Sequence, residues 1–284
     1  MNARQSSVEH CQDIVRTHDK DRYLASLFAP DAVRPHLWAL YAFNYEAARI
    51  REATSEPQLG EIRLQWWHDA IAGITRGQGA DGPLFSLLQE AIATGGLPRH
   101  ALFNLLEARR FDLYNDPMPD LATLEGYLGE TSSAVIQLSA MLLVGARAKE
   151  TAEAAGYAGI AYGITGLLRA VPLHRARGQC YIPAELLHKH GATVADVLAG
   201  HATSGVGAAI AELREHARRR LAEARQAGSA LPSRALAAFL PVSLADLYLA
   251  RLSLPNSDPL NTTADILQLV RQWRMWWRAS RGQF

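Results

Sequence analysis

The chain has 284 residues, of which 49% are hydrophobic and 20% charged, and its formal net charge is +1. This composition supports a packed core and excludes a disordered chain or one whose overall charge favours nucleic acid. Cys11 and Cys180 lie far apart and form no metal-ligand or redox spacing, which fits a reducing cytoplasm. The longest apolar stretch, around residues 133–146, is shorter than the roughly 18 residues that suggest a transmembrane helix. We expect a cytoplasmic protein and leave association with the cytoplasmic membrane open.

Nearly every segment is predicted to be helical, because apolar residues recur at spacings of three and four and β-branched runs are scarce. The third of these helices, which opens at Pro57, is expected to end at a glycine-rich break formed by Gly77, Gly79 and Gly82. No repeat or linker divides the chain, so one all-α domain over residues 1–284 is predicted. The expected helices, in chain order, cover residues 8–19, 31–52, from 57, 83–94, 98–113, 121–144, from 159, 183–188, 194–198, 206–227, 233–252 and 264–281.

Two segments resemble the motifs of a known family: ALYAFNYEAARIRE at residues 39–52 and GIAYGITGLLRAVPLHRARGQCYIP at residues 159–183. The squalene/phytoene synthase family has motifs that read approximately A-L-Y-A-F-C-R-x-x-D-D-x-x-D and Q-L-T-N-I-L-R-D-V-x-E-D-x-x-R-G-R-I-Y-L-P. The first segment is in register with its motif at residues 39–43. The resemblance implies a single-domain, all-α isoprenoid-synthase fold with a central cavity. The second segment matches its motif at Thr165, Leu168, Arg169, Val171, Arg177, Gly178, Tyr181 and Pro183.

The acidic positions of both motifs are changed. By resemblance, their aspartates hold Mg²⁺ ions that neutralise the diphosphate of a prenyl substrate, because a hard dication needs oxygen ligands. One acid among these positions cannot build a multi-magnesium cluster, so we expect no metal site, no cofactor and no catalytic residue; Mg²⁺ is expected only if the protein is an active enzyme. Pro172 lacks an N–H and should end or kink its helix. The substituted positions are Ala48, Arg49 and Glu52 in the first motif and Gly166, Ala170, Leu173 and His174 in the second.

This pattern of loss is similar to one branch of the family, typified by a mitochondrial complex I assembly factor of squalene/phytoene synthase type. That branch has A-F-N-x-E-x-A at residues 42–48 and L-R-A-x-P-x-H at residues 168–174, and both match here. The resemblance implies a protein that keeps the fold and has lost the synthase reaction.

An anion pocket without metal is one interpretation of the basic residues around the second motif. The alternative is that Arg169 pairs with a core acid such as Glu46 or Glu130, and that the other arginines are solvated. His174 is interpreted as a hydrogen-bonded structural residue rather than a metal ligand. The expected ligand-binding residues are Lys20, Arg34, Tyr41, Arg169, Arg175, Arg177 and Tyr181.

Two local predictions concern side chains near the motifs. Arg49 is expected to pair with Glu46 or Glu52, since both lie within one helical turn of it. Trp66 and Trp67 are expected to pack in the core.

The last helix is amphipathic. Ile266, Leu269, Val270 and three tryptophans (Trp273, Trp276, Trp277) line one side, and four arginines, at 271, 274, 278 and 281, crowd the other. This pattern suits an interfacial membrane helix or a docking helix. The alternative is a last helix that closes the core with its arginines reaching solvent.

Three functions remain open. The first is a catalytically degenerate binding or assembly protein in the biogenesis of respiratory complex I, with complex I subunits or assembly proteins as partners. The second is an active, divergent prenyltransferase that condenses prenyl diphosphates. The third is a prenyl-chain or lipid-binding protein that uses an apolar cavity. No nucleic-acid partner is expected, and membrane contact would be peripheral, through the C-terminal helix.

Overall fold

The computed structural model describes residues 3–54, 56–74, 82–254 and 257–284, and all regular structure within these ranges is helical. Six short segments are 3-10 or π turns: η1 (Arg110–Leu113), η2 (Gly129–Ser133, a π turn), η3 (Gly145–Thr151), η4 (Gly228–Ala230), η5 (Ser233–Ala235) and η6 (Leu240–Leu244). The α-helices are α1 (Ala3–His18), α2 (Lys20–Ser26), α3 (Arg34–Ala48), α4 (Ile50–Ala53), α5 (Pro57–Ile74), α6 (Pro83–Gly95), α7 (Arg99–Arg109), α8 (Leu121–Leu128), α9 (Ala134–Val144), α10 (Ala152–Arg169), α11 (Val171–Arg175), α12 (Ala184–Lys189), α13 (Val194–Ala199), α14 (Ser204–Ala227), α15 (Leu236–Phe239), α16 (Ala245–Arg251) and α17 (Gln268–Ser280).

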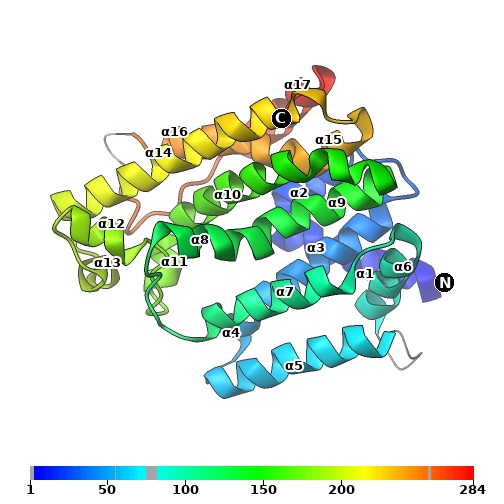
Figure 1. The fold of residues 1–284 in the computed structure, drawn as a ribbon, viewed down its shortest axis with the longest axis horizontal. Helices are drawn as coiled ribbons and strands as arrows, with labels where there is room; N and C mark the ends of the chain where they lie inside the picture. The colour runs from blue at the N-terminus through cyan, green and yellow to red at the C-terminus, as the bar shows by residue number, and fades with distance from the viewer. Residues whose placement is uncertain (1–2, 55, 75–81, 255–256) are drawn as a thin grey trace.

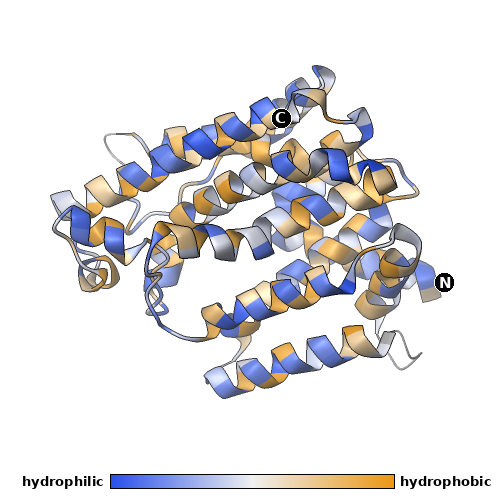
Figure 2. Cartoon of the chain, in the orientation of Figure 1, coloured by the Kyte–Doolittle hydropathy of each residue, from blue (hydrophilic) through white to orange (hydrophobic). Residues whose placement is uncertain are grey.

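Helix α10 lies in the middle of the bundle. It packs most extensively against α14 on one side and against η2 and α9 on the other, while α3 packs against α1, α6 and α9. Helix α5 contacts α7 at the opposite edge from α14 (Figure 1). Apolar residues gather on the inner helices, whereas α14 and α5 carry many hydrophilic residues (Figure 2). The all-α prediction is confirmed.

Several expected helices are divided. The helix predicted over 31–52 is interrupted at Arg49, between α3 and α4, and the helix predicted over 121–144 contains the η2 turn. Helix α10 ends at Arg169, and Pro172 lies in the first turn of α11, as the missing proline N–H predicts. Of the glycine-rich break, Gly77 and Gly79 lie outside the described residues.

The prediction that Trp66 and Trp67 both pack in the core is half right. Trp67 is buried, whereas Trp66, on another side of α5, is 51% exposed. Consecutive residues on a helix point about 100° apart, so only one of the two rings can face the core directly.

Two stretches are long and apolar enough to cross a membrane by composition, residues 121–169 and 233–251. In the fold, 50% and 67% of the residues in their most apolar windows are buried against other parts of the chain. Both stretches contain core helices, and core helices commonly reach this hydropathy.

The crossing of α10 over η2 depends on a glycine. A Cβ at Gly159 would lie 2.2 Å from Ser133 Cα and 2.3 Å from its backbone nitrogen. These are backbone atoms, so neither can rotate away. The hydroxyl of Ser133 also donates to the Gly156 carbonyl oxygen, at 2.8 Å. The central helix therefore approaches η2 at backbone contact distance.

We expect Gly159→Ala to destabilise the protein by about 2–3 kcal/mol, because the added methyl group forces the two backbones apart. Gly156→Ala is the matched control on the same helix, since a Cβ there meets nothing within 4 Å. It should leave stability unchanged or raise it by up to about 1 kcal/mol. Urea denaturation followed by circular dichroism measures both, and equal stability of the two variants would contradict the backbone contact.

Candidate functional site

The structure brings the two motif segments together through an ion pair. Arg177, which follows α11, donates from Nη1 to Oε1 of Glu52 on α4 at 2.6 Å. Both side chains are partly exposed, so the pair contributes little to stability, about 0–1 kcal/mol. A cation–carboxylate contact thus links Glu52, at an acidic position of the first motif, to Arg177, a matching residue of the second motif.

The remaining motif positions offer few ligands for a metal ion. Ala48, Gly166 and Ala170 have no polar side chain, and Arg49 donates to Glu46 Oε1 at 3.3 Å, which confirms one of its two predicted pairings. Within the described residues, no three His, Cys, Asp or Glu side chains are grouped so that they could hold a metal ion. Mg²⁺ requires several oxygen ligands, and the donors at these positions do not fit it.

Arg169, at the end of α10, pairs with carboxylates within the protein. Its Nη1 lies 4.0 Å from Asp21 Oδ2 and its Nη2 lies 3.5 Å from Asp265 Oδ1. Its guanidinium carbon lies 3.5 Å from the ring centroid of Tyr248, and its Nε donates to the Ala264 carbonyl oxygen. The internal pairing that the sequence left open is present, but its acids are Asp21 and Asp265 rather than Glu46 or Glu130.

A second arginine enters the same cluster from α17. The Nε of Arg271 lies 2.6 Å from Asp21 Oδ1, and its Nη2 donates to Asp265 at 2.9 Å and to the Tyr248 hydroxyl at 3.1 Å. The Tyr248 hydroxyl in turn donates to Asp21 Oδ2 at 3.0 Å. We call Asp21, Arg169, Tyr248, Asp265 and Arg271 the Asp21 network.

Three members of the Asp21 network are closed to solvent, whereas Arg169 is partly exposed and Asp265 is exposed. The side chains of Asp21 and Arg271 are 8% and 6% exposed, and Tyr248 is fully buried. Burial raises the pKa of the Asp21 carboxyl, while the adjacent Arg271 opposes that shift. Burial also raises the pKa of the Tyr248 hydroxyl, to about 12, with Asp21 adding to the effect. Two arginines and two carboxylates therefore balance one another within the fold.

Arg22 occupies the neighbouring interior between α3 and α10. Its guanidinium carbon lies 5.7 Å from the Tyr41 ring and 5.4 Å from the Tyr162 ring, and its Nη1 donates to Asp19 at 2.8 Å. Tyr41, expected to bind a ligand, is 1% exposed. A buried cation thus packs between the aromatic side chains of the two motif helices.

The sequence analysis missed Asp19, Asp21 and Arg22. In their segment, HDKDRYL at residues 18–24, Asp19 caps α2, which holds Asp21 and Arg22 and is only seven residues long, too short for a readable amphipathic pattern. The available signal was the density of charge next to an apolar helix. Lys20, the residue selected from this segment, is exposed.

Two other arginines that were expected to bind an anion instead donate hydrogen bonds to loop residues. Arg34 donates to the carbonyl oxygens of Leu27 and Ala29. Arg175 donates to the carbonyl oxygen of Leu260 and to the side chain of Asn261. The structure does not bring these two arginines into the Asp21 network.

Tyr181 and His174 belong to a second buried cluster. The Tyr181 hydroxyl donates to Asp112 Oδ1 at 2.6 Å, the Tyr127 hydroxyl donates to the same oxygen at 2.9 Å, and Arg109 donates to Oδ2 at 3.1 Å. The His174 ring centroid lies 4.7 Å from that of Tyr181, edge to face. Burial lowers the pKa of His174 to about 4, so the ring is neutral near pH 7.

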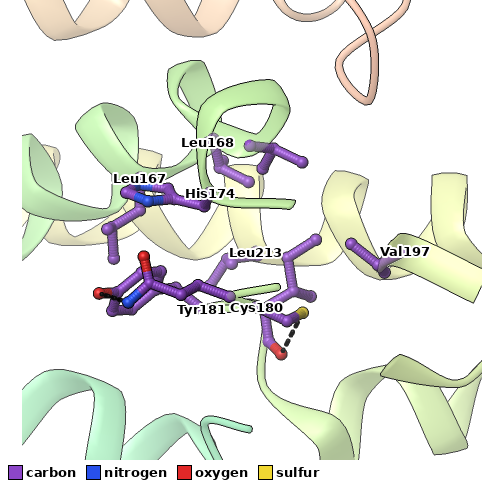
Figure 3. Close-up of a pocket in the computed structure, with 10 residues that line it drawn as sticks. Leu167, Leu168, His174, Cys180, Tyr181, Val197 and Leu213 are labelled. Carbon is purple, nitrogen blue, oxygen red and sulfur yellow. Dashed lines mark hydrogen bonds between the residues drawn. The ribbon is translucent and has the colours of Figure 1, made fainter. Parts of the chain in front are cut away.

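The pocket beneath the second motif is nearly filled. His174 and Tyr181 stand next to each other on its wall, with Leu167, Cys180 and Leu213 nearby (Figure 3). Its volume is about 10 Å³, room for roughly one water molecule.

A larger cavity, of about 600 Å³, borders the first motif. It lies between α1, α3, α4, α5 and α6. Glu46 and Arg49 form its polar side, and Trp66, Trp67 and Phe85 form its aromatic side.

The fold agrees with the comparisons to known proteins, and the matched range contains both motif segments. Residues 15–278 match the family model of squalene/phytoene synthases, and the chain belongs to that family. The structure of the squalene synthase HpnC from Alicyclobacillus acidocaldarius superimposes with a TM-score of 0.77, at 25% identity, over 88% of this chain and 97% of that one.

Two relatives of this chain have names that describe different functions. Complex I assembly factor 6 of Rattus norvegicus is 28% identical over 93% of this chain and 81% of its own length. Presqualene diphosphate synthase of Rhodopseudomonas palustris is 30% identical over 76% of this chain and 77% of its own length. The chain is thus similar both to assembly factors and to synthases of the family.

The depressed pKa of His174 predicts a loss of stability in mild acid. Below pH 6.5 the unfolded chain binds a proton at this residue before the folded chain does, because the folded pKa is about 4. The stability that neutral His174 contributes is present above pH 6.5 and is lost between pH 6.5 and 4, up to on the order of 3 kcal/mol. His174→Gln should lose less stability over this range in urea denaturation. An identical pH profile for the variant would contradict the assignment.

Removing the Asp21 carboxylate should leave two buried arginines undercompensated. We expect Asp21→Asn to cost about 3 kcal/mol of stability, because a buried pair is broken on one side only. Asp265→Asn is the control: the Asp265 side chain is 65% exposed, so its loss should cost at most about 1 kcal/mol.

Inorganic pyrophosphate should raise the melting temperature of Asp21→Asn more than that of the wild type. Equal pyrophosphate stabilisation of both proteins would show that the arginines are not neutralised internally.

Proposed function

We propose that this protein acts in assembly, in the biogenesis of a respiratory NADH:quinone oxidoreductase (complex I), and has lost metal-dependent prenyl condensation. The observation that carries the proposal is the internal neutralisation of Arg169 and Arg271 by Asp21 and Asp265. The similarity to complex I assembly factor 6 over 93% of the chain supports the assembly role.

The electrostatics of the site support the loss of synthase chemistry. A diphosphate binds where cations are free to pair with its oxygens, and its departure requires that developing charge be stabilised. At this site the arginines already contact carboxylates, and an entering diphosphate would meet the negative charge of Asp21 and Asp265. Glu52 is likewise held by Arg177. Both arginines of the Asp21 network thus contact carboxylates of the chain itself, although Arg271 Nε, 2.6 Å from Asp21 Oδ1, makes no aligned hydrogen bond.

Binding of a prenyl chain or lipid is a second candidate, favoured by the cavity of about 600 Å³ beside the first motif. This volume lies in the range of small-molecule pockets, and Trp66, Trp67 and Phe85 provide apolar contact surface. Such binding is compatible with an assembly role and does not require the missing acids.

In a deletion strain we expect the amount of assembled complex I, measured on native gels, to fall, because a factor needed for assembly is absent. Expression of the wild-type chain should restore it. The matched control is a presqualene diphosphate synthase expressed in the same strain, which shares the fold and should not restore it. An unchanged amount of complex I in the deletion strain would rule out the assembly role.

A parallel assay addresses catalysis directly. The purified protein is incubated with labelled farnesyl or geranylgeranyl diphosphate and Mg²⁺, with a presqualene diphosphate synthase as the positive control. We expect no condensed product. A condensed product would overturn the claim that catalysis is lost, while retention of label without turnover would support the binding candidate.

A further inference from the structure

The C-terminal helix α17 packs on the protein through its arginines. Arg271 reaches the Asp21 network, and Met275 is fully buried. Arg274 and Arg278 approach Asp246 Oδ2, at 2.9 and 3.7 Å. The polar side of this amphipathic helix therefore faces the protein, the reverse of the usual arrangement in a soluble protein.

The apolar side of α17 is consequently turned outward. Trp273 and Trp276 are 64% and 54% exposed, and their ring centroids lie 5.2 Å apart. Helix α2, which contacts α17, is followed by Leu27 and Phe28, also exposed by 41% and 43%. Single exposed apolar residues are common, but a cluster on one helix face marks a contact surface. The other exposed apolar residues of this face are Leu267, Leu269 and Val270.

Positive charge is in excess in α17 and the residues that follow it, and the exposed acids Asp265 and Asp31, near this face in sequence, are paired with Arg271 and Arg34. Residues 268–284 contain four arginines and no aspartate or glutamate. Arg225, Arg274 and Arg278 all approach Asp246, and burial together with the neighbouring Arg274 and Arg225 lowers the pKa of Arg278. Arg281 is exposed and lies 4.1 Å from the Trp277 ring centroid.

We propose that the outward face of α17 is a docking surface for an anionic lipid bilayer. Tryptophan rings prefer the interface between headgroups and acyl chains, and a basic surplus beside an apolar helix face is attracted to anionic lipid. A second copy of this chain is a poorer occupant, because a symmetric interface would place the two arginine surpluses near each other. The surface goes beyond the proposed function and does not depend on it.

The test is flotation of the purified full chain with vesicles of phosphatidylcholine alone or mixed with phosphatidylglycerol. We expect binding to the anionic vesicles, weaker binding at raised salt, and little binding to phosphatidylcholine alone. The double variant Trp273→Gln/Trp276→Gln should bind anionic vesicles about tenfold more weakly, because two interfacial anchors are lost. Ile62→Gln, which removes an apolar side chain of 64% exposure from α5 and does not line the cavity beside the first motif, is the control and should bind as the wild type does.

Two further measurements decide between the bilayer and other occupants. The melting temperature of the double variant should equal that of the wild type, which separates lost contact from lost folding. Light scattering in solution should give the same mass for both proteins. Failure of the wild type to float with anionic vesicles, or equal binding by the double variant, would overturn the proposal. A dimer that dissociates in the double variant would instead identify this face as a contact between copies.

Discussion

Asp21 carries a charge that the fold has to compensate, because a carboxylate that is 8% exposed has lost most of its hydration. Compensation comes from Arg271 on α17, Arg169 on α10 and the Tyr248 hydroxyl on α16. Four helices distant in sequence are thereby fixed to one another through a single side chain. Removing Asp21 or Arg271 leaves the other buried without its main counter-charge, so the two side chains depend on each other.

This requirement also bears on function. A site prepared for a diphosphate keeps its cations unpaired until the ligand arrives, at a cost in stability that ligand binding offsets. Here the cations are paired in the absence of ligand, and Arg22 fills the space between Tyr41 and Tyr162. The same fold can therefore be stable with an interior that has no need of a substrate.

The sequence predicted the helical class, the break at Pro172 and the Arg49–Glu46 contact, because each depends on neighbours within one or two helical turns. It did not predict the Asp21 network, whose members are separated by up to 250 positions along the chain. Glu52 and Arg177 were each singled out, but nothing in their separate segments indicated that they meet. Contacts of this kind depend on tertiary packing.

The orientation of α17 shows the same limit. Its two faces could be read from the sequence, but which face meets the protein depends on Asp21 and Asp246, located on other helices. Once these carboxylates are buried or half-buried, binding arginines costs less than leaving the carboxylates uncompensated, and the tryptophans must turn outward. The carboxylates of Asp21 and Asp246, which bind the arginines of α17, thus also determine that the apolar side of this helix faces outward. A change in the Asp21 network and a change in what α17 presents to its surroundings are coupled through Arg271.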